Sequence, residues 1–207
     1  ALLGRAERSP KSPGKSEGHA KAEAASQAAD EREGQPRTPR GAALLLTVGV
    51  ARSRRGDFAG ALEAFAQAHQ IRERTGTLKT SSTAELLLRA GGAREELGDL
   101  DGALRDLAEA REVRERTDTL ETPEGAELLM RLGALKARCG DLDGSQAVLL
   151  RALGIRWGTS TLDTFDGVSL LEQMAETRDA CGDTEGAEEA REEARRISWR
   201  IGLLRRL

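Results

Sequence analysis

The side chains that could do chemistry are few and widely spaced. The chain has two cysteines, Cys139 and Cys181, and two histidines, His19 and His69. The cysteines occupy the same position in adjacent units of a repeat described below, where neighbouring helices lie about 8–10 Å apart. That separation is too large for a disulfide, and without a nearby histidine the two thiols make no zinc site. We therefore expect free thiols and no metal site.

The histidines and carboxylates give no sign of a catalytic site. Neither histidine lies in a motif that places a serine or cysteine nucleophile beside it, and no phosphate-binding or metalloprotease motif is present. The acids fall on solvated helix faces, such as Glu188-Glu189 and Glu192-Glu193. No cleft is indicated that would raise a carboxyl pKa by burial. The sequence predicts no catalytic residue and no cofactor, and an enzyme is the least favoured alternative.

The composition indicates helices without an aromatic core. Of the 207 residues, 38% are hydrophobic, 32% are charged and only 2% are aromatic. Alanine, leucine, glutamate and arginine are strong helix formers, so we expect an all-α chain packed with leucine and alanine. The net charge of −3 gives no reason to expect nucleic acid as a partner. No apolar run is long enough to form a transmembrane span.

A repeat of 42 residues positions all of these side chains. Its clearest mark is a Gly-Asp pair, found at Gly56-Asp57, Gly98-Asp99, Gly140-Asp141 and Gly182-Asp183. Leucine pairs recur in the same frame at Leu44-Leu45, Leu86-Leu87, Leu128-Leu129 and Leu170-Leu171. The sequence therefore divides into repeat units at 38–79, 80–121, 122–163 and 164–205, preceded by a low-complexity tail at 1–37.

Each unit is predicted to form two helices. Thr122 is a good N-cap and Pro123 suits the first helical position. Gly140 is expected to end the first helix with a positive φ, as are Gly56 and Gly98, and Asp141 then caps the second helix. Small residues midway along the first helix allow the second helix to approach closely; these are Gly49, Gly91 and Gly133. A two-helix unit cannot bury both of its faces alone, so neighbouring units must stack.

This pattern resembles the tetratricopeptide repeat (TPR) family. The resemblance rests on the Gly-Asp turn, on pairs such as Leu132-Gly133 in the first helix, and on small residues such as Ala103 and Ala110 in the second. The 42-residue period is similar to the subclass in kinesin light chains and nephrocystin-like arrays, whereas HEAT-like helix pairs lack this turn. The family implies a right-handed α-solenoid of four stacked two-helix repeats. Two departures are Arg191, which replaces a large apolar residue, and basic residues in place of a helix-one tyrosine: Arg52, Arg94, Lys136 and Arg178.

The resemblance also implies a concave groove lined by the first helix of each unit. In units one to three this groove would have an apolar floor flanked by arginines, made by Leu46, Val50, Arg54, Leu88, Arg89, Met130, Arg131 and Arg138. Unit four would be acidic there, with Glu172, Gln173, Glu176 and Asp179. The chain has no asparagine, so the Lys/Asn carboxylate clamp of peptide-binding family members is absent. The groove would hold a helix or an apolar segment, or would be a solvated face.

The two ends are the other candidate binding elements. The tail at 1–37 has a composition that cannot order itself alone, so we expect order there only by contact with a partner. At the other end Ile197, Ile201 and Leu204 are predicted to pack on unit four. An exposed tryptophan among arginines would suit an acidic partner or anionic lipid headgroups, and this docking end comprises Trp199, Arg200, Leu203 and Arg206. The alternative is a frayed end whose tryptophan folds over its own repeat.

These features predict a non-catalytic protein–protein interaction scaffold, an accessory subunit of a larger assembly whose partners are other protein subunits. Two alternatives are a peripheral subunit of a respiratory or photosynthetic membrane complex and a peptide-binding co-receptor in transport, ciliary or chaperone settings. The chain begins with alanine rather than methionine, which is consistent with a processed product or a fragment. The compartment is not specified: cytoplasmic, ciliary, or organellar after cleavage of an upstream targeting segment.

Overall fold

The computed structural model describes residues 38–204, with side chains described to residue 202; the predicted N-terminal tail lies outside this range. The described residues form helices and no strand. In chain order the helices are α2 (Pro39–Arg54), α3 (Phe58–Arg74), α4 (Ser81–Glu96), α5 (Leu100–Arg116), α6 (Pro123–Arg138), α7 (Leu142–Gly158), α8 (Phe165–Ala180) and α9 (Thr184–Leu204). No helix of this part of the chain is long and apolar enough to cross a membrane.

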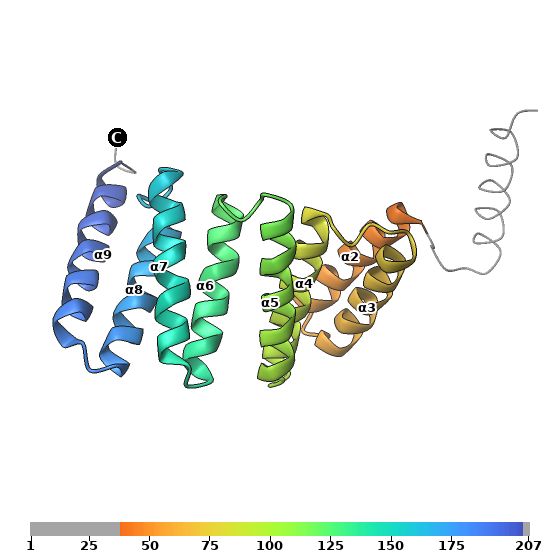
Figure 1. Cartoon of the computed structure of the whole chain (residues 1–207), viewed down its shortest axis with the longest axis horizontal. Coiled ribbons are helices and arrows are strands. Elements are labelled where there is room, and N and C mark those ends of the chain that lie inside the picture. Colours follow the sequence, from red (N-terminus) through yellow and green to blue (C-terminus); the bar gives the residue numbers. More distant parts are fainter. Residues whose placement is uncertain (1–37, 205–207) are drawn as a thin grey trace, which may run out of the picture.

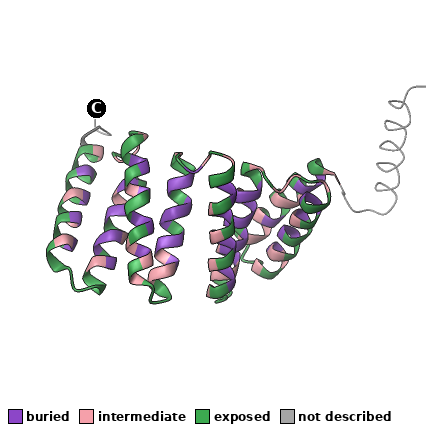
Figure 2. Cartoon of the chain, viewed as in Figure 1, coloured by how far each residue is buried: buried purple, intermediate pink, exposed green. Residues whose placement is uncertain are grey.

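The helices form four antiparallel pairs that stack in a row (Figure 1). The pairs are α2/α3, α4/α5, α6/α7 and α8/α9, and the second helix of each pair packs on the first helix of the next. The row runs from α2 at one end to α9 at the other, and buried residues gather where helices face one another (Figure 2). The predicted all-α solenoid is confirmed.

The Gly-Asp pair builds the turn within each unit. The glycines have φ between 81° and 84°, as at Gly98 and Gly140, a region that other residues rarely adopt. The aspartate that follows accepts a hydrogen bond from the backbone N–H three residues later; in Asp99 and Asp141 this bond is 2.9 Å long. Each turn therefore ends one helix and caps the next, as the sequence predicts.

Glycines of the first helices let the paired helices touch. A Cβ atom on Gly49 would lie 2.3 Å from the ring of Phe65, and one on Gly133 would lie 2.7 Å from Leu149. The basic residues that replace the family's tyrosine tie the same pairs together: the Arg52 guanidinium donates a 2.8 Å hydrogen bond to the carbonyl of Gly60 in α3. These residues fix how each pair closes.

Buried arginines mark the seams between units. Arg72, Arg114 and Arg156 share one repeat position near the end of the second helix, and their exposed fractions are only 4%, 6% and 2%. Arg72 donates to the hydroxyl oxygens of Ser82 at 2.5 Å and Thr83 at 3.1 Å, both at the start of α4. We call these three residues the seam arginines. In α9 the equivalent position holds Ser198, which is exposed.

Candidate functional site

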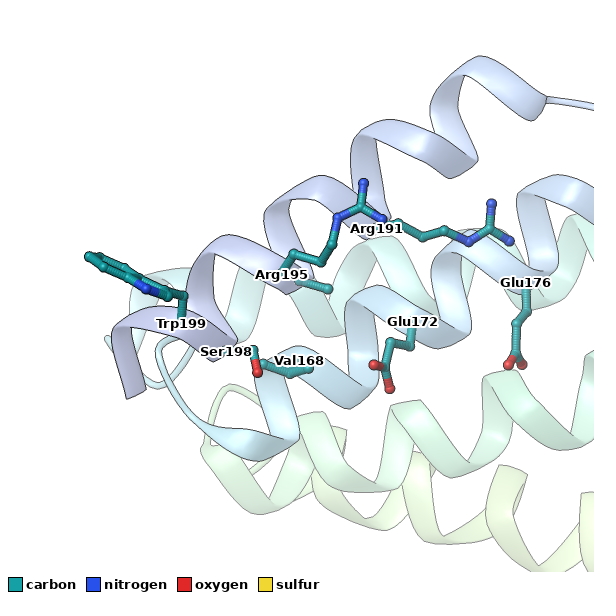
Figure 3. A pocket seen from close by; sticks show the side chains of 8 residues that line it. Val168, Glu172, Glu176, Arg191, Arg195, Ser198 and Trp199 are labelled. Atoms are coloured by element: carbon teal, nitrogen blue, oxygen red, sulfur yellow. The ribbon is translucent and has the colours of Figure 1, made fainter. Parts of the chain in front are cut away.

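A large hollow lies at the C-terminal end of the described part of the chain, between α8 and α9. This end groove has a volume of about 610 Å³ and is lined by Val168, Glu172, Glu176, Arg191, Ala194, Arg195, Ser198 and Trp199. In Figure 3 the two glutamates project from α8 and the two arginines from α9, with the tryptophan at one end. The groove occupies the face on which a following unit would stack.

On this face, unit four has charged residues where the other units have apolar or small ones. The positions of Glu172 and Glu176 are apolar or small in the other units: Leu46, Leu88 and Met130 for the first, and Val50, Gly92 and Ala134 for the second. Glu172 and Glu176 are one helical turn apart and exposed, and neither has an ion pair within residues 38–202. The end groove therefore presents two carboxylates without an ion pair beside Val168 and Ala194, although Glu176 is near enough to Arg191 to contribute to the raised pKa of that guanidinium.

The arginines of α9 are mostly neutralised. Arg191 pairs with Asp179, which raises the pKa of its guanidinium, and Arg195 lies 2.6 Å from Glu188. Arg196 and Arg200 lie 2.7 Å from Glu193 and 2.5 Å from Asp163, respectively. The basic character expected at this end is therefore offset by carboxylates of α8, α9 and the loop before α8. The free charge of the groove is negative.

Trp199 is a large apolar side chain at the surface of α9. Its exposed fraction is 70%, so it is not folded over its own repeat. Ile197 is fully buried and Ile201 packs against the same cluster, so the predicted apolar stripe holds α9 on unit four. Leu203, Leu204 and Arg206 lie outside the residues whose side chains the structure describes. The sequence analysis identified both the tryptophan and the acidic residues of unit four, but it assigned the acids to the concave groove and did not place them beside the tryptophan.

The first three units have a small hollow on the surface where the sequence predicts a concave groove. A hollow of about 210 Å³ joins Val50, Arg54, Leu88, Arg89 and Arg131. Leu88 and Met130 are buried, with exposed fractions of 3% and 7%, and Leu46 is half-buried, so the expected apolar floor belongs largely to the core.

The arginines beside that floor are also engaged, with one exception. Arg89 pairs with Glu85 at 2.7 Å and Arg131 with Glu127 at 3.5 Å, while Arg138 bridges from α6 to Glu95 of α4. Of the four arginines beside the floor, only Arg54 has no ion pair within residues 38–202. The four arginines of the concave surface thus contribute one free positive charge.

A third hollow, of about 290 Å³, lies between α3, α4 and α5 and includes His69, Arg94, Asp106 and Glu109. Burial raises the pKa of Asp106 to about 6, although Arg94 opposes the shift. The expectation that no cleft raises a carboxyl pKa is therefore wrong at this position. His69 lies 3.8 Å from Glu109, but no serine or cysteine lines the hollow, so it lacks a nucleophile.

The two cysteines are the remaining groups that could react. Cys139 and Cys181 are free and exposed. Within residues 38–202 no group of three or more histidine, cysteine or acidic side chains could hold a metal ion.

Comparison with known proteins identifies the fold. No protein-family model and no curated protein matches the sequence. The structure is similar to BtubC (BKLC) from P. vanneervenii, with 23% identity, a TM-score of 0.75, and coverage of 91% of this chain and 76% of that one. It is also similar to a putative kinesin light chain with TPR-like repeats from Podosopora anserina (18% identity, TM-score 0.71, coverage 84% and 82%). The match to MamA has 15% identity, a TM-score of 0.64, and coverage of 82% and 84%.

These likenesses show that the chain has the fold of a TPR-like α-solenoid. At these identities they do not extend to the kinesin-light-chain subclass that the repeat period resembles.

Proposed function

We propose that the chain is a non-catalytic protein-interaction scaffold and that its end groove binds a basic amphipathic helix of a partner protein. The observation that carries this proposal is the unpaired carboxylate pair of Glu172 and Glu176 beside an exposed tryptophan. Two basic side chains one helical turn apart would match the two glutamates. Apolar side chains of the same helix would contact Trp199, a residue type that often anchors interfaces.

The fold supports this reading. Stacked helix pairs leave an uncovered surface at each end of the row, and the end groove is where another helix would continue the stack. Docking at one end leaves the rest of the row free for other contacts. This arrangement suits an accessory subunit that joins a larger assembly end-on.

The charge balance favours a basic protein partner over an anionic lipid surface. Arg195, Arg196 and Arg200 each have a carboxylate within 2.7 Å, so headgroups would have to compete with these ion pairs. The glutamates of the groove would repel the headgroups as well. We therefore treat membrane binding as an outcome that the experiment must separate.

A fluorescence titration tests the proposal. Trp157→Phe leaves Trp199 as the sole tryptophan, and the full chain is titrated with a synthetic Leu/Lys helix whose lysines are spaced four residues apart. We expect saturable binding with a shift of the Trp199 emission, and no binding of the same peptide with glutamate for lysine. Glu172→Lys with Glu176→Lys should weaken binding at least about 10-fold.

Matched controls make the result specific. Glu185→Lys with Glu189→Lys reverses two exposed acids of α9 that are also four residues apart and lie outside the groove, so binding should persist. Equal loss in both double variants would show a general charge effect and overturn the proposal. Stronger binding to phosphatidylserine vesicles than to the basic peptide, unaffected by the Glu172/Glu176 reversal, would favour a membrane instead.

A further inference from the structure

The opposite end of the row exposes an apolar face that every later unit buries. Leu44 and Val48 of α2 have exposed fractions of 61% and 43%. At the position of Leu44 the other units have fully or almost fully buried leucines, at Leu86, Leu128 and Leu170 (2%, 0% and 0%). At the position of Val48 they have Ala90, Leu132 and Met174 (6%, 2% and 3%). In those units a preceding second helix covers these side chains.

The two ends of the row therefore differ in the residues that they expose. At the C-terminal end, Glu172 and Glu176 replace residues that are apolar or small in the other units. In α2, Leu44 and Val48 are apolar like the residues that a neighbouring helix covers in the other units. An apolar face of this kind implies that a helix packs on it. The nearest segment in the sequence is the chain before Pro39.

The residues before α2 continue the 42-residue frame. Aligned without gaps, residues 14–38 match residues 56–80 at eight positions, which are Gly14, Gly18, Ala22, Ala24, Glu31, Arg32, Gly34 and Thr38. Further upstream, Leu2-Leu3 and Arg5-Ala6 match Leu86-Leu87 and Arg89-Ala90 in the same frame. Composition alone describes this region as low in complexity, but its residues follow the repeat.

The three matched glycines have separate structural duties in unit one. Gly56 and Gly76 have φ of +81° and +67° at the two ends of α3. A Cβ atom on Gly60 would lie 2.3 Å from the capping carboxylate of Asp57. Gly14, Gly18 and Gly34 fall at the same three positions. Gly14 and Gly34 thus fall where unit one has a positive φ, whereas Gly18 has no capping aspartate beside it because Lys15 stands at the position of Asp57.

One difference from unit one is itself complementary. At the first described seam, the Arg72 guanidinium of α3 donates to the Ser82 hydroxyl of α4. The same two positions one unit earlier are Asp30 and Arg40. The arginine therefore lies on the other side of the seam, and an acid takes the position of Arg72. Arg40 is exposed and has no ion pair within residues 38–202. An Asp30–Arg40 ion pair would replace the Arg72–Ser82 hydrogen bond.

We infer that residues 16–32 form the second helix of a preceding unit and pack on Leu44 and Val48 of the same chain. Lys15 and Glu23 stand where unit one has the capping Asp57 and the core Phe65, so this helix lacks a cap and a large core residue. It is held by small side chains and by the Asp30 contact, and is the most weakly attached element of the row. Docked there, it closes the N-terminal end and leaves the end groove as the open one.

A disulfide trap tests this register. The hydroxyl oxygens of Ser145 in α7 and Thr177 in α8 lie 3.4 Å apart, and the equivalent pair at the proposed seam is His19 and Ala51. In the full chain with Cys139→Ser and Cys181→Ser, we introduce His19→Cys with Ala51→Cys. The matched control is Lys21→Cys with Ala51→Cys, because position 21 corresponds to Ala147, which is exposed.

The expected result is an intramolecular disulfide that forms at least about 10-fold faster for the 19/51 pair than for the 21/51 pair. Adding Leu44→Asp should reduce that preference, and it should leave the other units folded because Leu44 is exposed in residues 38–202; circular dichroism checks this. Equal rates for the two pairs would overturn the inference. Disulfide-linked dimers in place of the intramolecular product would overturn docking within the same chain.

Discussion

Asp106 shows how one buried carboxyl group can make the stability of this protein depend on pH. Its side chain in α5 is nearly buried, with Arg94 at 3.3 Å, yet one carboxylate oxygen accepts no hydrogen bond. Desolvation therefore outweighs the attraction of Arg94, and the pKa rises to about 6. An unfolded aspartate has a pKa of about 3.9, so the native state retains the proton over a wider range of pH than the unfolded chain does.

The sign of the effect follows directly. Between about pH 4 and pH 6 the folded state binds more protons than the unfolded state, so the free energy of unfolding should fall as the pH rises through this window. Asp106→Asn should remove that fall and stabilise the protein near pH 7 by up to about 3 kcal/mol. Urea unfolding of both proteins at pH 4, 5 and 7 measures how the free energy of unfolding depends on pH. Glu112→Gln, an exposed acid of the same helix, should leave the pH profile unchanged, and parallel profiles for wild type and Asp106→Asn would refute the account.

At the scale of the helix, substitution of a glycine in a turn and of a glycine inside a helix should change the stability in opposite directions. A side chain on Gly98 would meet no atom within 4 Å, but the residue has φ of +81°. Gly98→Val should therefore cost about 1 kcal/mol or more through the backbone alone. Gly154 also has open space around it but lies inside α7, so Gly154→Ala should stabilise the protein by up to about 1 kcal/mol. Denaturant unfolding of the two variants should give shifts of opposite sign; shifts of the same sign would contradict this.

The helix pairs could be predicted from the sequence because their signals are local. Gly140 and Asp141 define a turn whose hydrogen bonds span only a few residues, and Gly133 marks the contact with Leu149 within one unit. The surface of the row could not be predicted in the same way. Whether Leu88 or Met130 faces a groove depends on how far the neighbouring units cover it, and that depends on the stacking rather than on the periodicity of one helix.

The charges of the site illustrate the same limit. Arg138 contacts Glu95, which is 43 residues away in the sequence, and Arg200 contacts Asp163, which is 37 residues away. No spacing rule within one helix reveals such pairs, so the arginines looked free and the C-terminal end looked basic. The replacement of apolar repeat positions by Glu172 and Glu176 was visible in the sequence. Its meaning became clear only when the structure showed both acids unpaired beside Trp199.

At the scale of the whole molecule, the contacts run almost entirely between adjacent helices. Stability in such a row is approximately a sum of unit and seam contributions, and a unit with one seam is less protected than a unit with two. In native-state hydrogen exchange, amides of α5 and α6 should therefore exchange more slowly than those of α9. Equal protection of these helices would show that the row unfolds as one cooperative block.

The seam arginines also bear on the order in which the row is completed during synthesis. As the chain emerges from its N-terminus, Arg72 is made before Ser82 and Thr83, the hydroxyl groups that satisfy its guanidinium. The buried Arg72 guanidinium therefore gains these partners only after the start of the second unit has been translated, so the burial of this arginine depends on the unit that follows. Ser198 carries no such requirement, so unit four can close as soon as its own helices have been made.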